Sequence, residues 1–145
     1  MKAQEELQQI LLYDAKINSK LEELVRLKSL ATKVTTAMEG EVVSRSRNPD
    51  TMGDTVVKII EMQDEINRLI DVYVDKKNYF SKIIDSLQKP LYITVLYGHY
   101  FHGKPFKKLA DELGYTKRNI CYIHGDALVA VEKIMQDANV FPVFP

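Results

Sequence analysis

The chain has 145 residues, of which 46% are hydrophobic and 28% are charged, and its formal net charge is zero. This composition is typical of a folded globular protein and excludes a disordered chain. A neutral chain has no overall field that attracts nucleic acid, so such binding has to come from a local cluster of positive charge. Because Cys121 is the only cysteine, an intrachain disulfide and a cysteine-rich zinc site are also excluded.

The beginning of the chain, MKAQEELQQILLYDAK, carries charges where a secretory signal has an apolar core. No later stretch approaches the roughly 18 consecutive apolar residues of a membrane-spanning helix. We therefore expect a cytoplasmic protein with no membrane partner.

Two long amphipathic helices are predicted in the first 89 residues. The first covers about residues 4–36 and repeats apolar side chains every seven positions, at Ile10, Ile17, Leu24 and Ala31. The second covers about residues 54–87 and shows the same spacing at Ile59, Ile66, Tyr73, Phe80 and Leu87. A seven-residue repeat is typical of coiled-coil pairing, and two helices of similar length predict an antiparallel hairpin over residues 1–89.

The apolar stripe of each long helix is wider than one partner helix covers. This favours a homodimer formed through the hairpin. The alternative is that the C-terminal helices fold back and cover the stripe.

The segment between the long helices, residues 37–53, is predicted to be a loop because Gly40, Pro49 and Gly53 break helices. Arg45 and Arg47 alternate with serines in this loop and could contact a phosphate backbone or a protein partner. A solvated loop explains them equally well.

Residues 90–145 are predicted to form a helix-turn-helix domain. After a helix over about residues 91–101, the small Ala110 is followed four residues later by Gly114, which can adopt the positive φ that ends a helix. Thr116 then has the side-chain oxygen of an N-cap, so the next helix is expected from Lys117 to about Met135. In a helix-turn-helix, this second helix enters the DNA major groove. A purely structural use of the same two helices is the alternative.

Candidate DNA-binding residues occupy the first turns of that second helix. Lys117, Arg118, Asn119 and Tyr122 lie away from the apolar stripe of Ile120 and Ile123, and they are donors suited to phosphates and base edges. Together with Lys104, Lys107 and Lys108, the cluster gives residues 90–124 a net charge of +3. Such a small patch predicts modest DNA affinity and a requirement for a dimer or a protein partner.

Two regions give a resemblance to known proteins. The run LYITVLYGHYFHGKPFKKLADELGYTKRNICYIHGDAL, residues 91–128, resembles the fourth region of bacterial sigma factors, the helix-turn-helix that binds the promoter −35 element. The whole chain also resembles short phage regulators of late genes, the RinA/ArpU-like group. The matching features are the long first helix, the DTMGDTVVKI segment that begins at Asp50, the second long helix and the run YTKRNICYIHGDAL.

This resemblance implies a phage transcription regulator that binds double-stranded DNA in the host cytoplasm and acts with host RNA polymerase at late promoters. The positions that match the DNA-contacting sigma helix are Lys117, Arg118, Asn119, Cys121 and Tyr122, and Thr116 matches the capping residue of that helix. His124 lies one turn further on, roughly on the DNA-facing side, where a phosphate contact and a packing role are both open. Cys121 and Tyr122 stand where sigma factors often have Arg and Gln, so only the docking mode carries over.

Two other function classes stay open. One is a DNA-packaging protein similar to a small terminase subunit, and the other is a sigma mimic that binds polymerase without DNA. An enzyme is not expected, because the sequence lacks a glycine-rich phosphate loop and a nucleophile with a recognisable context. We expect no cofactor and no metal site. The C-terminal segment Phe141 to Pro145 is apolar and could pack on the domain or bind a partner.

Overall fold

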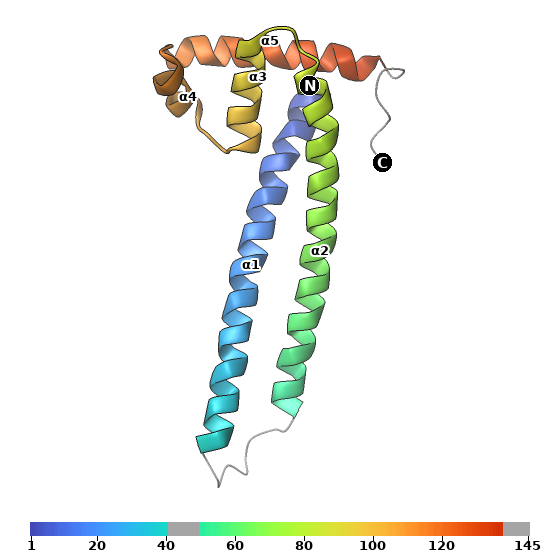
Figure 1. The fold of residues 1–145 in the computed structure, drawn as a ribbon, viewed down its shortest axis with the longest axis vertical. Helices are drawn as coiled ribbons and strands as arrows, with labels where there is room; N and C mark the ends of the chain where they lie inside the picture. Colours follow the sequence, from blue (N-terminus) through green and yellow to red (C-terminus); the bar gives the residue numbers. More distant parts are fainter. Residues whose placement is uncertain (41–49, 138–145) are drawn as a thin grey trace. The chain divides into compact units, whose positions relative to one another are not determined.

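A computed structural model describes residues 1–40 and 50–137, with side chains for residues 1–33 and 53–137. The described residues are helical and include no strand, which confirms the all-α prediction for this part of the chain (Figure 1). The elements are α1 (Lys2–Gly40), α2 (Asp50–Asp85), α3 (Pro90–Leu96), the π-helical turn η1 (Tyr97–Phe101), α4 (Phe106–Leu113) and α5 (Lys117–Gln136). None of the helices in these residues is long and apolar enough to cross a membrane.

Both long helices extend beyond their predicted ends. α1 continues to Gly40, and α2 begins at Asp50 instead of residue 54, so Gly53 lies inside a helix that it was predicted to break. One exposed glycine costs a helix only about 1 kcal/mol relative to alanine, which a helix of this length tolerates. The predicted loop contacts of Arg45 and Arg47 and the predicted packing of the segment 141–145 lie outside the described residues.

The chain divides into two compact units, and the division differs from the predicted boundary at residues 89 and 90. The core unit comprises Met1–Asp14 and Val72–Pro145, whereas the two-helix unit comprises Ala15–Asp71. Each long helix therefore contributes to both units. The physical reason is that the C-terminal helices pack only on the first turns of α1 and the last turns of α2.

In the two-helix unit, α1 and α2 run side by side in opposite directions (Figure 1). Ile17, Leu24 and Ile66 of the seven-residue repeat are buried between them. Lys20 Nζ lies 3.0 Å from Glu65 Oε1 and joins the two helices. The hydrogen bond from Lys20 is the main reason that the pKa of Glu65 is lowered.

The larger hydrophobic cluster of the core unit combines both long helices with the C-terminal helices. Its largest fully buried side chains come from α1, α2 and α3: Leu7, Ile10, Phe80, Ile83, Ile84 and Leu96. α5 adds Ala127, Leu128 and Val131 to the same cluster. Within the core unit, the C-terminal helices therefore cover the apolar stripe, as the second of the two predicted alternatives required.

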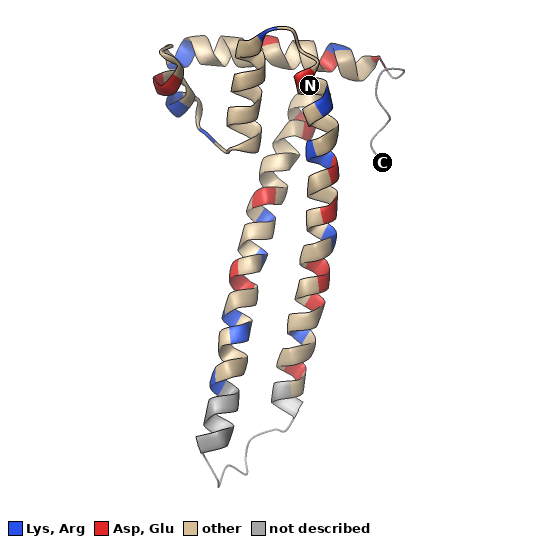
Figure 2. Ribbon diagram, viewed as in Figure 1, with Lys and Arg blue, Asp and Glu red and all other residues tan. Residues whose placement is uncertain are grey.

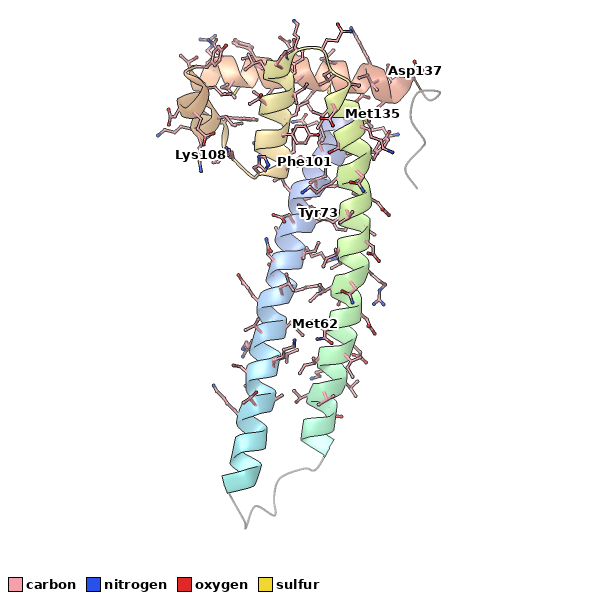
Figure 3. All side chains as sticks on the ribbon, viewed as in Figure 1. Met62, Tyr73, Phe101, Lys108, Met135 and Asp137 are labelled. Atoms are coloured by element: carbon pink, nitrogen blue, oxygen red, sulfur yellow. The ribbon has the colours of Figure 1, made fainter. Side chains whose placement is uncertain are left out.

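Polar contacts join the same helices. Glu132 Oε2 in α5 accepts a hydrogen bond of 2.7 Å from the Ala3 backbone N–H at the start of α1, one of the donors that a helix start leaves without a partner. The Tyr97 hydroxyl donates to Asp85 Oδ1 at 2.7 Å and so joins η1 to the last turn of α2. Lys77 Nζ lies 5.0 Å from the centre of the Tyr73 ring and 5.1 Å from that of Phe101, two residues labelled in Figure 3.

A smaller cluster positions α4. It contains Val95, Leu109, Ala110 and Ile120 from three helices. The predicted helix over residues 91–101 is present, but its last five residues form the π-helical turn, in which the His102 N–H donates to the Tyr97 carbonyl at 3.0 Å. Gly98 in this turn faces Leu109 so closely that a Cβ atom would lie 2.6 Å from Leu109 Cδ2. The backbone of η1 and α4 can approach this closely only because residue 98 has no side chain.

Candidate nucleic-acid interface

The connection between α4 and α5 is a three-residue turn at residues 114–116. Gly114 has a φ of 76°, and the backbone N–H groups of Gly114 and Tyr115 both donate to the Ala110 carbonyl, the latter at 2.9 Å. Thr116 is extended, and its Oγ1 accepts a hydrogen bond of 3.1 Å from the Asn119 N–H. The glycine C-cap, the threonine N-cap and the start of α5 at Lys117 are thus confirmed. This turn fixes the direction in which the first residues of α5 point.

The predicted contact residues of α5 lie on its solvent-exposed side. Thr116, Lys117, Arg118, Asn119, Cys121 and Tyr122 are all exposed, whereas Ile120 is fully buried beneath them. Tyr122 is 60% exposed, which is high for a tyrosine. We call Lys117, Arg118, Asn119, Cys121 and Tyr122 the donor face. The first turn of a helix also presents free backbone N–H groups and the positive end of the helix dipole.

Two residues of the donor face contact each other. Arg118 Nε and Nη2 both lie 3.3 Å from the Tyr122 hydroxyl, and the guanidinium carbon lies 5.8 Å from the centre of the Tyr122 ring. The pair is four residues apart on one helical face, where such contacts form. Arg118 is thereby held along the helix with guanidinium donors still open to solvent.

α4 contributes further positive charge. Lys107 and Lys108 are exposed, and Lys108 points away from the helices in Figure 3. Lys104 behaves differently, because its Nζ lies 2.9 Å from Glu112 Oε2. Much of the charge of Lys104 is therefore balanced inside the domain. The exposed positive groups of α4 and of the first turn of α5 are Lys107, Lys108, Lys117 and Arg118, and Figure 2 shows Lys and Arg in blue on both helices.

His124 does not lie on the outward side where the sequence analysis placed it. It is only 8% exposed, and its Nε2 lies 2.6 Å from the Tyr100 hydroxyl. Residue 124 follows Ile120 by four positions and precedes Leu128 by four, so helical spacing puts it in the buried stripe. Of the two roles left open, packing is the one that its position supports.

Burial determines the protonation of this pair. It lowers the pKa of His124 to about 4, with a smaller contribution from the charge of His99, and it raises the pKa of Tyr100 to about 12. At neutral pH both groups are therefore uncharged, and the hydrogen bond joins a protonated phenol to a neutral imidazole.

Sequence reasoning missed a ring cluster around this hydrogen bond. The His99 ring stacks on Phe106 with 4.2 Å between centres, and Phe106 lies 4.7 Å from His124. His99 Nδ1 also lies 2.8 Å from the Lys104 carbonyl oxygen. Tyr100, His99, Phe106 and His124, the ring cluster, thus connect η1, the start of α4 and α5. Local sequence patterns could not reveal it, since its members are up to 25 positions apart.

A metal site has no support in the part of the chain that is described, where no three His, Cys, Asp or Glu side chains are grouped to hold an ion. No protein-family model, no curated protein and no solved structure matches the chain. Its resemblance to phage regulators and to sigma factors is therefore a prediction from the residues alone.

Proposed function

We propose that the protein is a DNA-binding transcription regulator in which α4, the turn and α5 act as a helix-turn-helix. The observation that carries this proposal is the donor face, whose hydrogen-bonding side chains are exposed at the start of a helix held by a glycine C-cap and a threonine N-cap. In this docking mode the first turns of α5 enter the major groove. Lys107 and Lys108 of α4 then face the phosphate backbone.

Each member of the donor face has a chemical role in this complex. Lys117 and Arg118 form charge-assisted hydrogen bonds with phosphates or with guanine, whose major-groove edge presents two acceptors. Asn119 has the amide that pairs with adenine through two hydrogen bonds. Tyr122 and Cys121 sit where a thymine methyl group or a sugar would come close.

The resemblance to phage regulators extends the proposal to late phage transcription. A sigma-region-four-like domain behind a long helical hairpin matches a phage regulator that works with host RNA polymerase at late promoters. The hairpin then serves as the homodimerisation element, which compensates for the small positive patch. The neutral net charge supports a separate dimerisation element, because a neutral monomer binds DNA weakly.

Selection from a pool of random double-stranded DNA tests the function without knowledge of the operator. We expect the protein to enrich one defined sequence, and we expect the Lys117→Ala/Arg118→Ala variant not to enrich it. Lys133→Ala is the matched control, because Lys133 is an exposed basic residue near the other end of α5.

Failure of the wild-type protein to retain any DNA at low salt would contradict the proposal. If the same protein then bound purified bacterial RNA polymerase, the sigma-mimic alternative would replace it.

A further inference from the structure

Gly125 lies in the interior of α5, at the ninth of its 20 residues. Its backbone is helical and its φ is not positive, so no turn requires a glycine here. A Cβ atom at this position would meet nothing within 4 Å, so close packing within the described part of the chain does not require one either. A glycine in a helix interior is less stable than an alanine. Neither conformation nor packing therefore explains why α5 carries a destabilising residue at this point.

Gly53 provides a comparison within the same chain. It is also exposed and helical, and a Cβ atom there would also meet nothing within 4 Å. However, Gly53 is the fourth residue of α2, where the backbone N–H groups do not yet have partners within the helix. Gly125 instead interrupts a helix that has complete turns on both sides.

Helical spacing places Gly125 on the same side of α5 as the donor face. It follows Tyr122 by three residues and Cys121 by four, so it lies one turn beyond them, and it is exposed. Val129 lies one further turn along the helix. Tyr122 is 60% exposed and Val129 is 43% exposed. Large exposed side chains therefore stand before and after a position that has no side chain.

The chemistry around Gly125 suits an uncharged group. Cys121, Tyr122 and Val129, the neighbours one turn away on this side, carry no charge. The exposed Asp126 follows Gly125 directly, turned by about 100° around the helix. A carboxylate so near disfavours a phosphate at this position. Of the backbone groups that line the major groove of DNA, the uncharged deoxyribose is the one that fits.

The distance along α5 indicates which part of the DNA reaches Gly125. Gly125 lies eight residues after Lys117, about 12 Å along the helix at about 1.5 Å per residue. The major groove of B-DNA is also about 12 Å wide. With the start of α5 in the groove, the far wall of the groove meets the helix close to Gly125.

We propose that a deoxyribose of this groove wall packs directly on the α5 backbone at Gly125, and that the missing side chain sets how deeply α5 enters the groove. A residue without a Cβ atom allows such an approach to the helix backbone. The inference rests on the proposed function and deepens it, because it adds a residue that determines the fit to DNA without donating a hydrogen bond from a side chain.

Two measurements on Gly125→Ala and Gly125→Leu test the proposal: affinity for the selected DNA sequence and the temperature of thermal unfolding. We expect the affinity to fall about fivefold for Gly125→Ala and about 100-fold for Gly125→Leu, because the added atoms occupy space that the DNA needs. The unfolding temperature should rise in both variants, because alanine and leucine favour a helix more than glycine does.

Gly53→Leu is the matched control. It adds the same side chain to an exposed helical glycine in α2 and should keep the wild-type affinity for DNA. An unchanged affinity in Gly125→Leu would overturn the proposal. A lower unfolding temperature in Gly125→Ala would also overturn it, because Gly125 would then have a packing role.

The outcome is separable from the DNA-binding proposal. If Lys117→Ala/Arg118→Ala loses affinity and Gly125→Leu does not, the start of α5 binds DNA and only the contact at Gly125 is wrong. A wild-type protein that retains no DNA would instead contradict the proposed function itself.

Discussion

At the scale of single residues, α5 has an exposed side and a packing side. Tyr122 is 60% exposed, whereas His124, two positions later, is 8% exposed and bonded to Tyr100. The packing side holds the ring cluster, which fixes where α4 and η1 meet α5. The orientation of the donor face thus depends on a histidine on the buried side of the helix.

The neutral state of His124 makes stability depend on pH. Its pKa is about 4 in the folded protein and near 6.5 when unfolded, so between these values the unfolded chain binds more protons. The contribution of this residue is complete above about pH 6.5 and is lost as the pH falls toward 4. We expect the free energy of unfolding, from urea titrations, to fall more between pH 7 and pH 4.5 in the wild type than in His124→Gln.

His102→Gln is the control for this comparison, because His102 is exposed and lies near the same ring cluster. It should retain the wild-type pH dependence. An equally steep dependence in His124→Gln and in the wild type would show that this histidine is not the titrating group.

The N-cap of α5 is a second prediction at this scale. Thr116→Ala removes the acceptor of the Asn119 N–H and should lower the free energy of unfolding by about 1 kcal/mol. Thr116→Ser keeps an oxygen in the same place and should cost only a few tenths of that. Equal losses for both variants in urea unfolding would mean that the cap hydrogen bond contributes nothing.

At the scale of elements, the sequence predicted the features that depend on neighbouring residues, namely the long helices and their caps. The seven-residue repeat located both long helices, and residue types alone predicted the Gly114 and Thr116 caps, since their φ angle and side-chain oxygen are local requirements. The π-helical turn and the helical position of Gly53 escaped prediction. The π-helical turn depends on the tertiary packing of Tyr97 on α2, which no residue type in the turn reveals. The helical position of Gly53 depends on the length of α2, which is long enough to tolerate one glycine.

The close approach of η1 to α4 gives a prediction at this scale. Gly98→Ala should destabilise the protein by about 1–3 kcal/mol, because the new Cβ atom overlaps Leu109 Cδ2 and Leu109 is only 2% exposed. Thermal unfolding of Gly98→Ala, Leu109→Ala and the double variant measures the coupling.

Leu109→Ala opens space next to residue 98, so the double variant should be more stable than the sum of the two losses predicts. Gly125→Ala is the control, because a Cβ atom there meets nothing within 4 Å. Strict additivity of the Gly98 and Leu109 losses would contradict the proposed contact.

At the scale of the whole molecule, the division into units could not be predicted from a change in composition. The predicted boundary followed Pro90, which is a local helix signal, but Pro90 lies inside the core unit. What divides the chain is long-range burial of residues such as Leu7 and Phe80 by α5. The donor face was predictable because its residues are neighbours on one helix, whereas the ring cluster joins three elements.

In the proposed regulator, the two kinds of contact belong to different parts of the chain. We propose the helical hairpin for pairing with a second copy and the donor face of the core unit for binding DNA. A dimer would double the four exposed positive groups of α4 and of the first turn of α5, which would raise the affinity for two half-sites without a high net charge.

The most direct test of DNA binding by α5 is the affinity for the selected DNA sequence, measured at several salt concentrations. We predict that Lys117→Ala/Arg118→Ala binds at least tenfold more weakly than the wild type. Its plot of log affinity against log salt should be flatter by about 0.9 for each phosphate that the variant no longer neutralises. Lys133→Ala should match the wild type in both quantities. An unchanged affinity and slope in the double variant would show that the start of α5 does not contact DNA.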